Sequence, residues 1–168
     1  YVGAGSSGLM AIADGLELPG TFGIPADRIK LLLAGGGGDL LSMPGDVEDD
    51  ENLARADLRE AGLRRGDCAV LVSASGTTPY TIAVLRGMRR AGVHTIGIAN
   101  SSGSTLLTEA DSAICLSTPP EVISGSTRMG AGTAQKIALN MFSALIGIEL
   151  GHVHDGLMVN LTADNEKL

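Results

Sequence analysis

Two short loops rich in glycine and hydroxyl side chains are the part of this chain best suited to holding a ligand. One reads GAGSSG over residues 3–8, and the other reads SASGTTPY over residues 73–80. Each loop follows an apolar run and leads into a segment of helical character. A helix that begins directly after a strand points free backbone N–H groups at one spot, where the helix dipole adds partial positive charge. The two loops therefore predict an anion site.

A phosphate monoester, with three oxygens to satisfy, suits these hydroxyl groups best. GAGSSG also matches the G-x-G-x-x-G pattern of dinucleotide-binding loops, which need an acidic residue at the end of the next strand. Here that strand ends in Leu33, Ala34 and Gly35, and no carboxylate follows before Asp39. We therefore predict phosphate binding rather than nucleotide binding. The residues predicted to form this site are Ser6, Ser7, Gly8, Ser75, Gly76, Thr77 and Thr78.

Near-continuous apolar runs alternate with helical patterns along the chain. Five runs without polar alternation are predicted to be strands covered on both faces: residues 1–3, 29–34, 68–73, 95–99 and 113–116. The helical patterns lie at residues 7–16, 51–61, 79–91, 104–110 and 132–150. Right-handed crossovers then give an α/β fold, a doubly wound parallel five-stranded sheet in a three-layer αβα sandwich. Ligands in such sheets bind at the carboxyl ends of the strands, where both loops lie.

The composition excludes several classes of protein. Twelve basic residues against nineteen acidic ones give a net charge of -7, and no basic cluster is interleaved with aromatics, so no nucleic-acid partner is expected. No apolar run approaches the roughly 18 residues that a membrane span needs. Cys68 and Cys115 lie in apolar runs, which predicts buried free thiols in a reducing compartment, the cytoplasm. His94, His152 and His154 lack partners at metal-ligand spacing, and we expect neither a metal nor a cofactor.

The last predicted helix is apolar on most of its circumference. One stripe consists of Ala134, Ile137, Ala138, Met141, Leu145 and Ile148. A second stripe consists of Leu139, Phe142 and Ile146. Such a helix fits a subunit interface, so we predict a homodimer. The alternative is that it forms the central core helix of a monomer.

Several longer motifs carry a family resemblance. GAGSSG, ASGTTPY and SGSTRMGAGTAQK together resemble a sugar isomerase (SIS) phosphosugar-binding domain. More narrowly, EVISGSTRMGAGTAQK at 121–136, NMFSAL at 140–145, LMVN at 157–160 and NEKL at 165–168 resemble the N-acetylmuramic acid 6-phosphate etherases. The resemblance spans essentially the whole chain. It implies a single SIS domain over residues 1–168, with the leading helical segment and the trailing helical subdomain of that family lying outside it.

The resemblance also implies a reaction and the residues for it. Enzymes of this family cleave the D-lactyl ether at C3 of N-acetylmuramic acid 6-phosphate, giving N-acetylglucosamine 6-phosphate and D-lactate by elimination and then addition of water. One carboxylate removes the C2 proton, and a second carboxylic acid protonates the departing lactate. The matching positions carry Glu17 as the acid and Glu48 as the base. Further candidates for contacting the substrate are Ser126, Thr127 and Lys136.

The two glutamates also have plainer interpretations. Burial of Glu17 between two leucines and before a proline would raise its pKa and suit an acid, but an ordinary carboxylate at a helix end fits the same pattern. Glu48 lies in an acidic run that also fits a solvated loop or the first turn of a helix. Only the match to the family selects these two residues.

The same holds for the residues near the last helix. Ser126 and Thr127 fit a cap at the turn before that helix as well as they fit a substrate contact. Lys136 shares a polar stripe with Asn140 and Ser143, and this stripe fits a plain solvent-facing surface equally well.

The chain departs from the family pattern in the loops that would form the site. Where the family has Ser-Gly-Arg, Gly-Gly-Glu, Ser-Gly-Arg-Thr and Arg-x-Lys-Ala-Gly, this chain has Leu9, Gly37, Thr77 and Gly130. The missing basic side chains weaken the match to an anionic lactyl group more than the match to phosphate. The alternative functions are a non-catalytic phosphosugar sensor, like the similar eukaryotic glucokinase regulatory protein, and an aldose/ketose phosphate isomerase.

Overall fold

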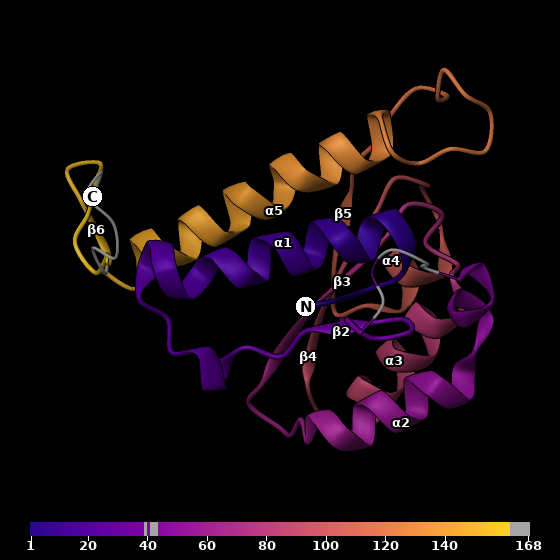
Figure 1. Ribbon diagram of the computed structural model, residues 1–168, viewed down its shortest axis with the longest axis horizontal. Helices are drawn as coiled ribbons and strands as arrows, with labels where there is room; N and C mark the ends of the chain where they lie inside the picture. The colour runs from indigo at the N-terminus through magenta and orange to yellow at the C-terminus, as the bar shows by residue number, and fades with distance from the viewer. Residues whose placement is uncertain (39, 41–43, 162–168) are drawn as a thin grey trace.

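The apolar runs form one parallel sheet in the computed structural model, which describes residues 1–38, 40 and 44–161 (Figure 1). The strands stand in the order β2-β1-β3-β4-β5, and each neighbouring pair is parallel. They are β1 (Val2–Gly3), β2 (Leu32–Leu33), β3 (Cys68–Ser73), β4 (His94–Ala99) and β5 (Ser112–Cys115). The predicted doubly wound α/β fold is confirmed. Asp39 and the NEKL motif lie outside the described residues.

Helices cover both faces of the sheet and complete the three layers. α1 (Gly5–Phe22) and α5 (Gly130–Glu149) lie side by side on one face, as Figure 1 shows. The helices α2 (Glu51–Ala61), α3 (Pro79–Arg90) and α4 (Thr105–Glu109) pack on the opposite face. Two 3-10 helices, η1 (Ala26–Arg28) and η2 (Gly45–Asp49), lie on either side of β2 in the chain. A short antiparallel hairpin of β6 (Val153–His154) and β7 (Leu157–Met158), which the sequence does not predict, follows α5.

Alternation along β3 divides the core into two halves. Val70 and Val72 pack with Leu139 of α5. Ala69 and Leu71, which point to the other face, belong to the larger cluster formed with α2, α3 and α4. Successive side chains of a strand point to opposite faces, so a strand covered on both faces must be apolar throughout. This is why the run CAVLVS shows no polar alternation.

The first helix is longer than its sequence pattern indicates. The pattern predicts a helix over residues 7–16, whereas α1 continues through Pro19 to Phe22. It ends at Gly23, whose left-handed backbone (φ 65°) lets its N–H donate a hydrogen bond to the Pro19 carbonyl at 3.0 Å. Pro19 removes one helical hydrogen bond, the one that an N–H there would donate to the Gly15 carbonyl, and α1 continues for three more residues despite this loss. Glu17 therefore lies within the helix and not at its end.

The alternative prediction, that the last helix forms the central core helix of a monomer, is wrong for the single chain. α5 is the outermost helix of its layer (Figure 1). Its side chains Ile137, Met141, Leu145 and Ile148 are 53%, 60%, 57% and 52% exposed. Despite this apolar face, no helix within the described residues is both long and apolar enough to cross a membrane.

The prediction of buried thiols is also wrong. Cys68 and Cys115 are both free and exposed. Cys68 is the first residue of β3, at the end of the strand, and Cys115 lies on β5, which forms an edge of the sheet and alternates between half-buried and exposed side chains. An apolar run therefore does not bury a cysteine that lies at the end of a strand, like Cys68, or on an edge strand, like Cys115.

The contact between α1 and α5 depends on a glycine. A Cβ at Gly147 would lie 2.5 Å from the ring of Phe22, so we predict that Gly147→Ala lowers the free energy of unfolding by about 1–3 kcal/mol through overpacking. Gly20→Ala is the matched control, since Gly20 is also helical but has no atom within 4 Å of such a Cβ. There, alanine should stabilise the helix by up to about 1 kcal/mol. Denaturant unfolding of both variants checks this, and equal effects would contradict it.

Candidate functional site

The loop after β3 gathers four hydroxyl side chains at the start of α3. Ser73 Oγ accepts a hydrogen bond from the Gly76 N–H at 3.0 Å and lies 2.9 Å from Thr78 Oγ1. Ser75 Oγ accepts hydrogen bonds from the backbone N–H and the hydroxyl of Thr77, both at 3.2 Å. The first turn of α3 contains no acidic residue. Its positive end therefore stays open to an anion, with hydroxyl groups around it.

Gly76 is the residue that the shape of this loop requires. Its φ is 68°, and a Cβ at this position would collide with the side chain of Ser104. Its carbonyl accepts a hydrogen bond from the Leu106 N–H at 2.9 Å, which ties the loop to α4. The buried Ser104 Oγ has no hydrogen-bond partner among the described residues. A buried hydroxyl in this state is a further polar group that a bound anion or water can satisfy.

The glycines of the first loop bring β1 and α1 into close contact. A Cβ at Gly3 would lie 2.7 Å from Gly8 Cα, and a Cβ at Gly8 would collide with Leu33. The Gly8 N–H donates a hydrogen bond to the Ala4 carbonyl at 2.9 Å. Gly8 thus serves the packing of the helix on the sheet, and its N–H is not free for the phosphate contact that the sequence analysis assigned to it.

The two loops lie next to each other at the carboxyl ends of the neighbouring strands β1 and β3. β1 pairs with β3, and Gly3 stands opposite Val72, so both strands end at the same level. In the first loop Ser6 is partly exposed and Ser7 is buried. The structure brings the two predicted loops together, while contact of their side chains with a ligand stays a prediction.

Glu48 stands at the N-terminus of α1, beside the first loop. It belongs to η2, and its carboxylate lies so close to Gly5 that a Cβ there would collide with Oε1. Burial raises the pKa of the half-buried Glu48 carboxyl above its usual range, and the neighbouring charge of Asp49 raises it further. A carboxyl group with a raised pKa next to an anion site suits a base that works near neutral pH.

Glu17 lies away from this place. It follows Gly5 by twelve residues on α1, which corresponds to about 18 Å along the helix axis at about 1.5 Å per residue. Its side chain is exposed. The predicted partial burial of Glu17 is therefore wrong for a single chain. Within one chain the structure does not bring Glu17 and Glu48 together.

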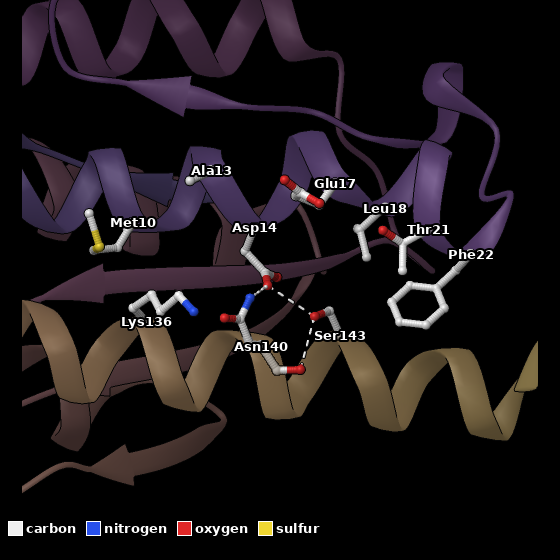
Figure 2. Close-up of a pocket in the computed structure, with 10 residues that line it drawn as sticks. All are labelled: Met10, Ala13, Asp14, Glu17, Leu18, Thr21, Phe22, Lys136, Asn140 and Ser143. Atoms are coloured by element: carbon white, nitrogen blue, oxygen red, sulfur yellow. Dashed lines mark hydrogen bonds between the residues drawn. The ribbon is translucent and has the colours of Figure 1, made fainter. Parts of the chain in front are cut away.

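Glu17 lines a groove of about 370 Å³ between α1 and α5. Figure 2 shows Lys136, Asn140 and Ser143 on α5, facing Asp14 of α1 across this groove. The polar stripe of α5 therefore faces α1 and not only open solvent. Lys136 lies in the groove, on the helix opposite to Glu17, and not in the loop after β3.

Asp14 is a structural position that the sequence analysis missed. Its buried carboxylate accepts hydrogen bonds from Asn140 Nδ2 at 2.8 Å and from Ser143 Oγ at 2.9 Å (Figure 2). It also accepts one from the Tyr1 hydroxyl at 2.9 Å. Burial and the charge of Asp14 raise the pKa of the Tyr1 hydroxyl, which keeps it a donor. These bonds fix α1 against α5. The sequence contains a signal for this role, because Asp14 is an acidic residue on the apolar face of the helical pattern, close to Ala11.

The N-terminus of α5 is occupied by a side chain of the protein. The Glu121 carboxylate accepts hydrogen bonds from the Gly130 N–H at 3.1 Å and the Ala131 N–H at 3.0 Å, and these bonds lower its pKa. Ser126 Oγ accepts from a backbone N–H two residues later at 3.3 Å and so shapes the preceding turn. Thr127 is exposed. Neither hydroxyl caps α5, and their contact with a substrate stays a prediction.

The positions that depart from the family pattern surround the two loops and the start of α5. Leu9 follows the first loop within α1, Gly37 is exposed after β2, Thr77 is exposed in the second loop, and Gly130 opens α5. In the part of the chain that the structure describes, no three His, Cys, Asp or Glu side chains lie close enough to hold a metal ion.

Comparison with known proteins agrees with the motifs. The family model of the SIS domain matches residues 47–145. Over all 168 residues the chain is 44% identical to the N-acetylmuramic acid 6-phosphate etherase of Deinococcus radiodurans, 46% to that of Symbiobacterium thermophilum and 38% to that of Bacillus subtilis. The chain spans only 55–56% of the length of these relatives. The predicted resemblance is confirmed.

Solved structures share the same fold. The C-terminal domain of glucosamine-fructose-6-phosphate aminotransferase from Francisella tularensis superposes with a TM-score of 0.66 at 21% identity, over 95% of this chain and 38% of that one. The sugar isomerase domain of an RpiR transcription factor from Sphaerobacter thermophilus gives 0.61 at 24% identity, over 88% and 68%. β1 and β2, which precede the stretch matched by the family model, belong to the same sheet.

A pair of glycines tests the role of the second loop. Gly76 and Gly103 both have φ 68°, so alanine at either position carries about 1–2 kcal/mol of left-handed strain. Only Gly76→Ala also collides with Ser104, since nothing lies within 4 Å of a Cβ at Gly103. We predict that Gly76→Ala weakens binding of inorganic phosphate about tenfold or more relative to Gly103→Ala, which is about 1.4 kcal/mol. Phosphate titration followed by NMR checks this, and equal affinity of the two variants would contradict it.

Proposed function

The chain belongs to the SIS domain family, and on this premise we propose that it binds a 6-phosphorylated amino sugar. In the full-length protein it acts as an etherase that converts N-acetylmuramic acid 6-phosphate to N-acetylglucosamine 6-phosphate and D-lactate. The observation that carries the proposal is the position of Glu48 beside two adjacent loops rich in hydroxyl groups. The etherase names of relatives that are 38–46% identical support the choice of substrate.

The phosphate binds in the loop after β3. The chain has a net charge of -7, so the long-range field of the protein does not attract an anion and the donors must be local. The hydroxyls of Ser75, Thr77 and Thr78 and the first-turn N–H groups of α3 are such donors. Ser6 of the adjacent loop, which is partly exposed, supplies a further hydroxyl.

The reaction divides between two glutamates. In the ring-opened sugar the aldehyde acidifies the C2–H bond, and the Glu48 carboxylate removes this proton while the C3–O bond breaks. Glu17 gives its proton to the departing lactate oxygen, which is otherwise a poor leaving group. Water then adds across the C2–C3 double bond, with hydroxide to C3. The remaining proton of this water goes to Glu17, and Glu48 returns its proton to C2. Glu17 is then protonated and Glu48 ionised, as at the start.

The proposal also covers the oligomeric state of the protein and its cellular compartment. Residues 1–168 constitute one SIS domain that forms a homodimer through the exposed apolar stripe of α5. Sedimentation of the purified protein at micromolar concentration tests the homodimer, and a monomer would contradict it. The reaction belongs to amino-sugar catabolism during peptidoglycan recycling, in the cytoplasm, where the exposed thiols Cys68 and Cys115 stay reduced.

Release of D-lactate from N-acetylmuramic acid 6-phosphate by the full-length protein tests the function. We predict that Glu48→Gln lowers kcat by at least about 100-fold, because the general base is lost, while affinity for N-acetylglucosamine 6-phosphate stays within about threefold. Glu51→Gln is the matched control, an acidic residue of the same run that pairs with Arg55 on the surface. It should retain full activity.

The alternative functions predict other results in this assay. Tight phosphosugar binding without any turnover by the full-length protein would contradict the etherase and indicate a sensor. Formation of a ketose phosphate without lactate would indicate an isomerase. Equal loss of activity in Glu48→Gln and Glu51→Gln would remove Glu48 from the reaction.

The raised pKa of Glu48 gives the reaction a predictable acid limb. Glu48 acts as a base only when ionised, so kcat/KM falls as the pH drops through its pKa, which burial and Asp49 hold above the ordinary range. Asp49→Asn removes a negative charge that opposes ionisation, so the pKa falls and the acid limb moves to lower pH. Asp46→Asn, on the same 3-10 helix, serves as the control. A pH–rate profile with an unmoved or upward-shifted limb in Asp49→Asn would contradict this assignment.

A further inference from the structure

We infer that Gln135 is a positioning residue of the phosphate site, and that it acts on this site through Asn100. The inference rests on the proposed function, because it concerns the loop after β3 to which we assign the phosphate. It adds a residue that does not touch the substrate but keeps in place the loop that does.

Asn100 joins three segments at the carboxyl ends of the strands. It follows β4 directly, and its backbone N–H donates a hydrogen bond to the carbonyl of Ala74, in the loop after β3, at 3.1 Å. Its side-chain Nδ2 donates to the carbonyl of Leu116, directly after β5, at 3.0 Å. Its Oδ1 accepts from Nε2 of Gln135, on α5, at 2.8 Å. Asn100 therefore ties the phosphate loop to α5 and to the loop that leads into it.

The partners of Asn100 fix the direction of both amide groups. The Leu116 carbonyl can only accept, so the Asn100 amide points Nδ2 toward it and Oδ1 toward α5. Gln135 must then present Nε2, since two facing amide oxygens cannot form a hydrogen bond. Its Oε1 is left buried and without a hydrogen-bond partner among the described residues. The network thus has one arrangement, and exchanging N and O in either amide would break it.

Packing alone does not favour a glutamine at position 135. The Gln135 side chain is fully buried, and its unpaired Oε1 loses contact with water without compensation, which costs stability. An apolar side chain of similar length would avoid this cost. What glutamine contributes that such a side chain lacks is the Nε2 donor to Asn100.

The position of Asn100 matters for phosphate binding because the loop after β3 is held from outside at few points. Among the described residues, the Asn100 N–H holds the carbonyl of Ala74, and the Leu106 N–H holds that of Gly76. α5 and α3 lie on opposite faces of the sheet, as Figure 1 shows, so Gln135 supports the loop from the face away from α3. A shift of Asn100 moves Ala74, and with it the hydroxyls on either side of Ala74.

Titration of the full-length protein with inorganic phosphate, followed by NMR, tests the inference in Gln135→Met. Methionine keeps the length of the side chain and removes the Nε2 donor. We expect phosphate affinity to fall about five- to tenfold, the effect of one lost hydrogen bond. Ser143→Ala is the matched control. It removes another buried hydrogen bond of α5, about 12 Å further along the helix at about 1.5 Å per residue, and should leave affinity within about twofold of wild type.

A second variant shows whether Gln135 acts through Asn100. Asn100→Ser removes the side-chain contact with Gln135 but keeps the backbone hydrogen bond to Ala74, and we expect it to weaken phosphate binding at least as much as Gln135→Met. The double variant should then bind phosphate like Asn100→Ser alone, because the second change removes nothing further. Losses that add, or equal phosphate affinity of Gln135→Met and Ser143→Ala, would overturn the inference.

The reaction provides a readout that a general loss of stability does not imitate. In the D-lactate assay, Gln135→Met should raise KM about fivefold and leave kcat within about twofold, because Glu48 is not part of the Asn100 network. A lower kcat at unchanged KM would overturn the inference. Wild-type protein that binds no phosphate would overturn the proposed function together with the inference, whereas wild-type binding that Gln135→Met retains in full would overturn the inference alone.

Discussion

The rigid length of α1 is the constraint on which the account of this protein depends. The helix starts at the close contact between Gly3 and Gly8, and hydrogen bonds to the buried Asp14 fix its middle against α5. Its two ends therefore cannot move independently. Glu48 lies at one end and Glu17 three turns away, so the fold of a single chain separates the two groups to which we assign the proposed elimination.

The anion binding that we propose depends on geometry more than on charge. The chain is acidic overall, and the loop after β3 has Thr77 where the family has an arginine. What the loop offers instead is the positive end of α3 and a set of hydroxyls that orient one another around Ser73. Donors of this kind act over short distances only, so recognition of the phosphate should respond weakly to ionic strength. The left-handed backbone of Gly76, which permits no side chain next to Ser104, maintains that arrangement.

Much of the fold was predictable from periodicity, because a parallel sheet covered on both faces requires continuous apolar runs. The bounds of α2 and β3 match the prediction, and the five strands were all found. The end of α1 was not predictable from Pro19, since the helix continues despite the one hydrogen bond lost there and ends at Gly23. The exposure of Cys68 and Cys115 depends on strand order and strand ends, which local sequence does not contain.

Part of the candidate site, too, was predictable from the sequence, and part was not. The two hydroxyl loops could be recognised because each follows a strand directly, and pairing of β1 with β3 then places them side by side. The Asp14 network could not, because its partners Asn140 and Ser143 are more than a hundred residues away in the chain. The separation of Glu17 from Glu48 also escapes the sequence, in which both residues simply match the family motifs. It depends on α1 continuing as one straight helix.

A crystal structure of the full-length protein with N-acetylglucosamine 6-phosphate tests the central claim most directly. The account predicts the phosphate at the hydroxyls of residues 73–78, with Glu48 within hydrogen-bond reach of the sugar. A sugar bound elsewhere, or one that leaves Glu48 out of hydrogen-bond reach, would contradict it.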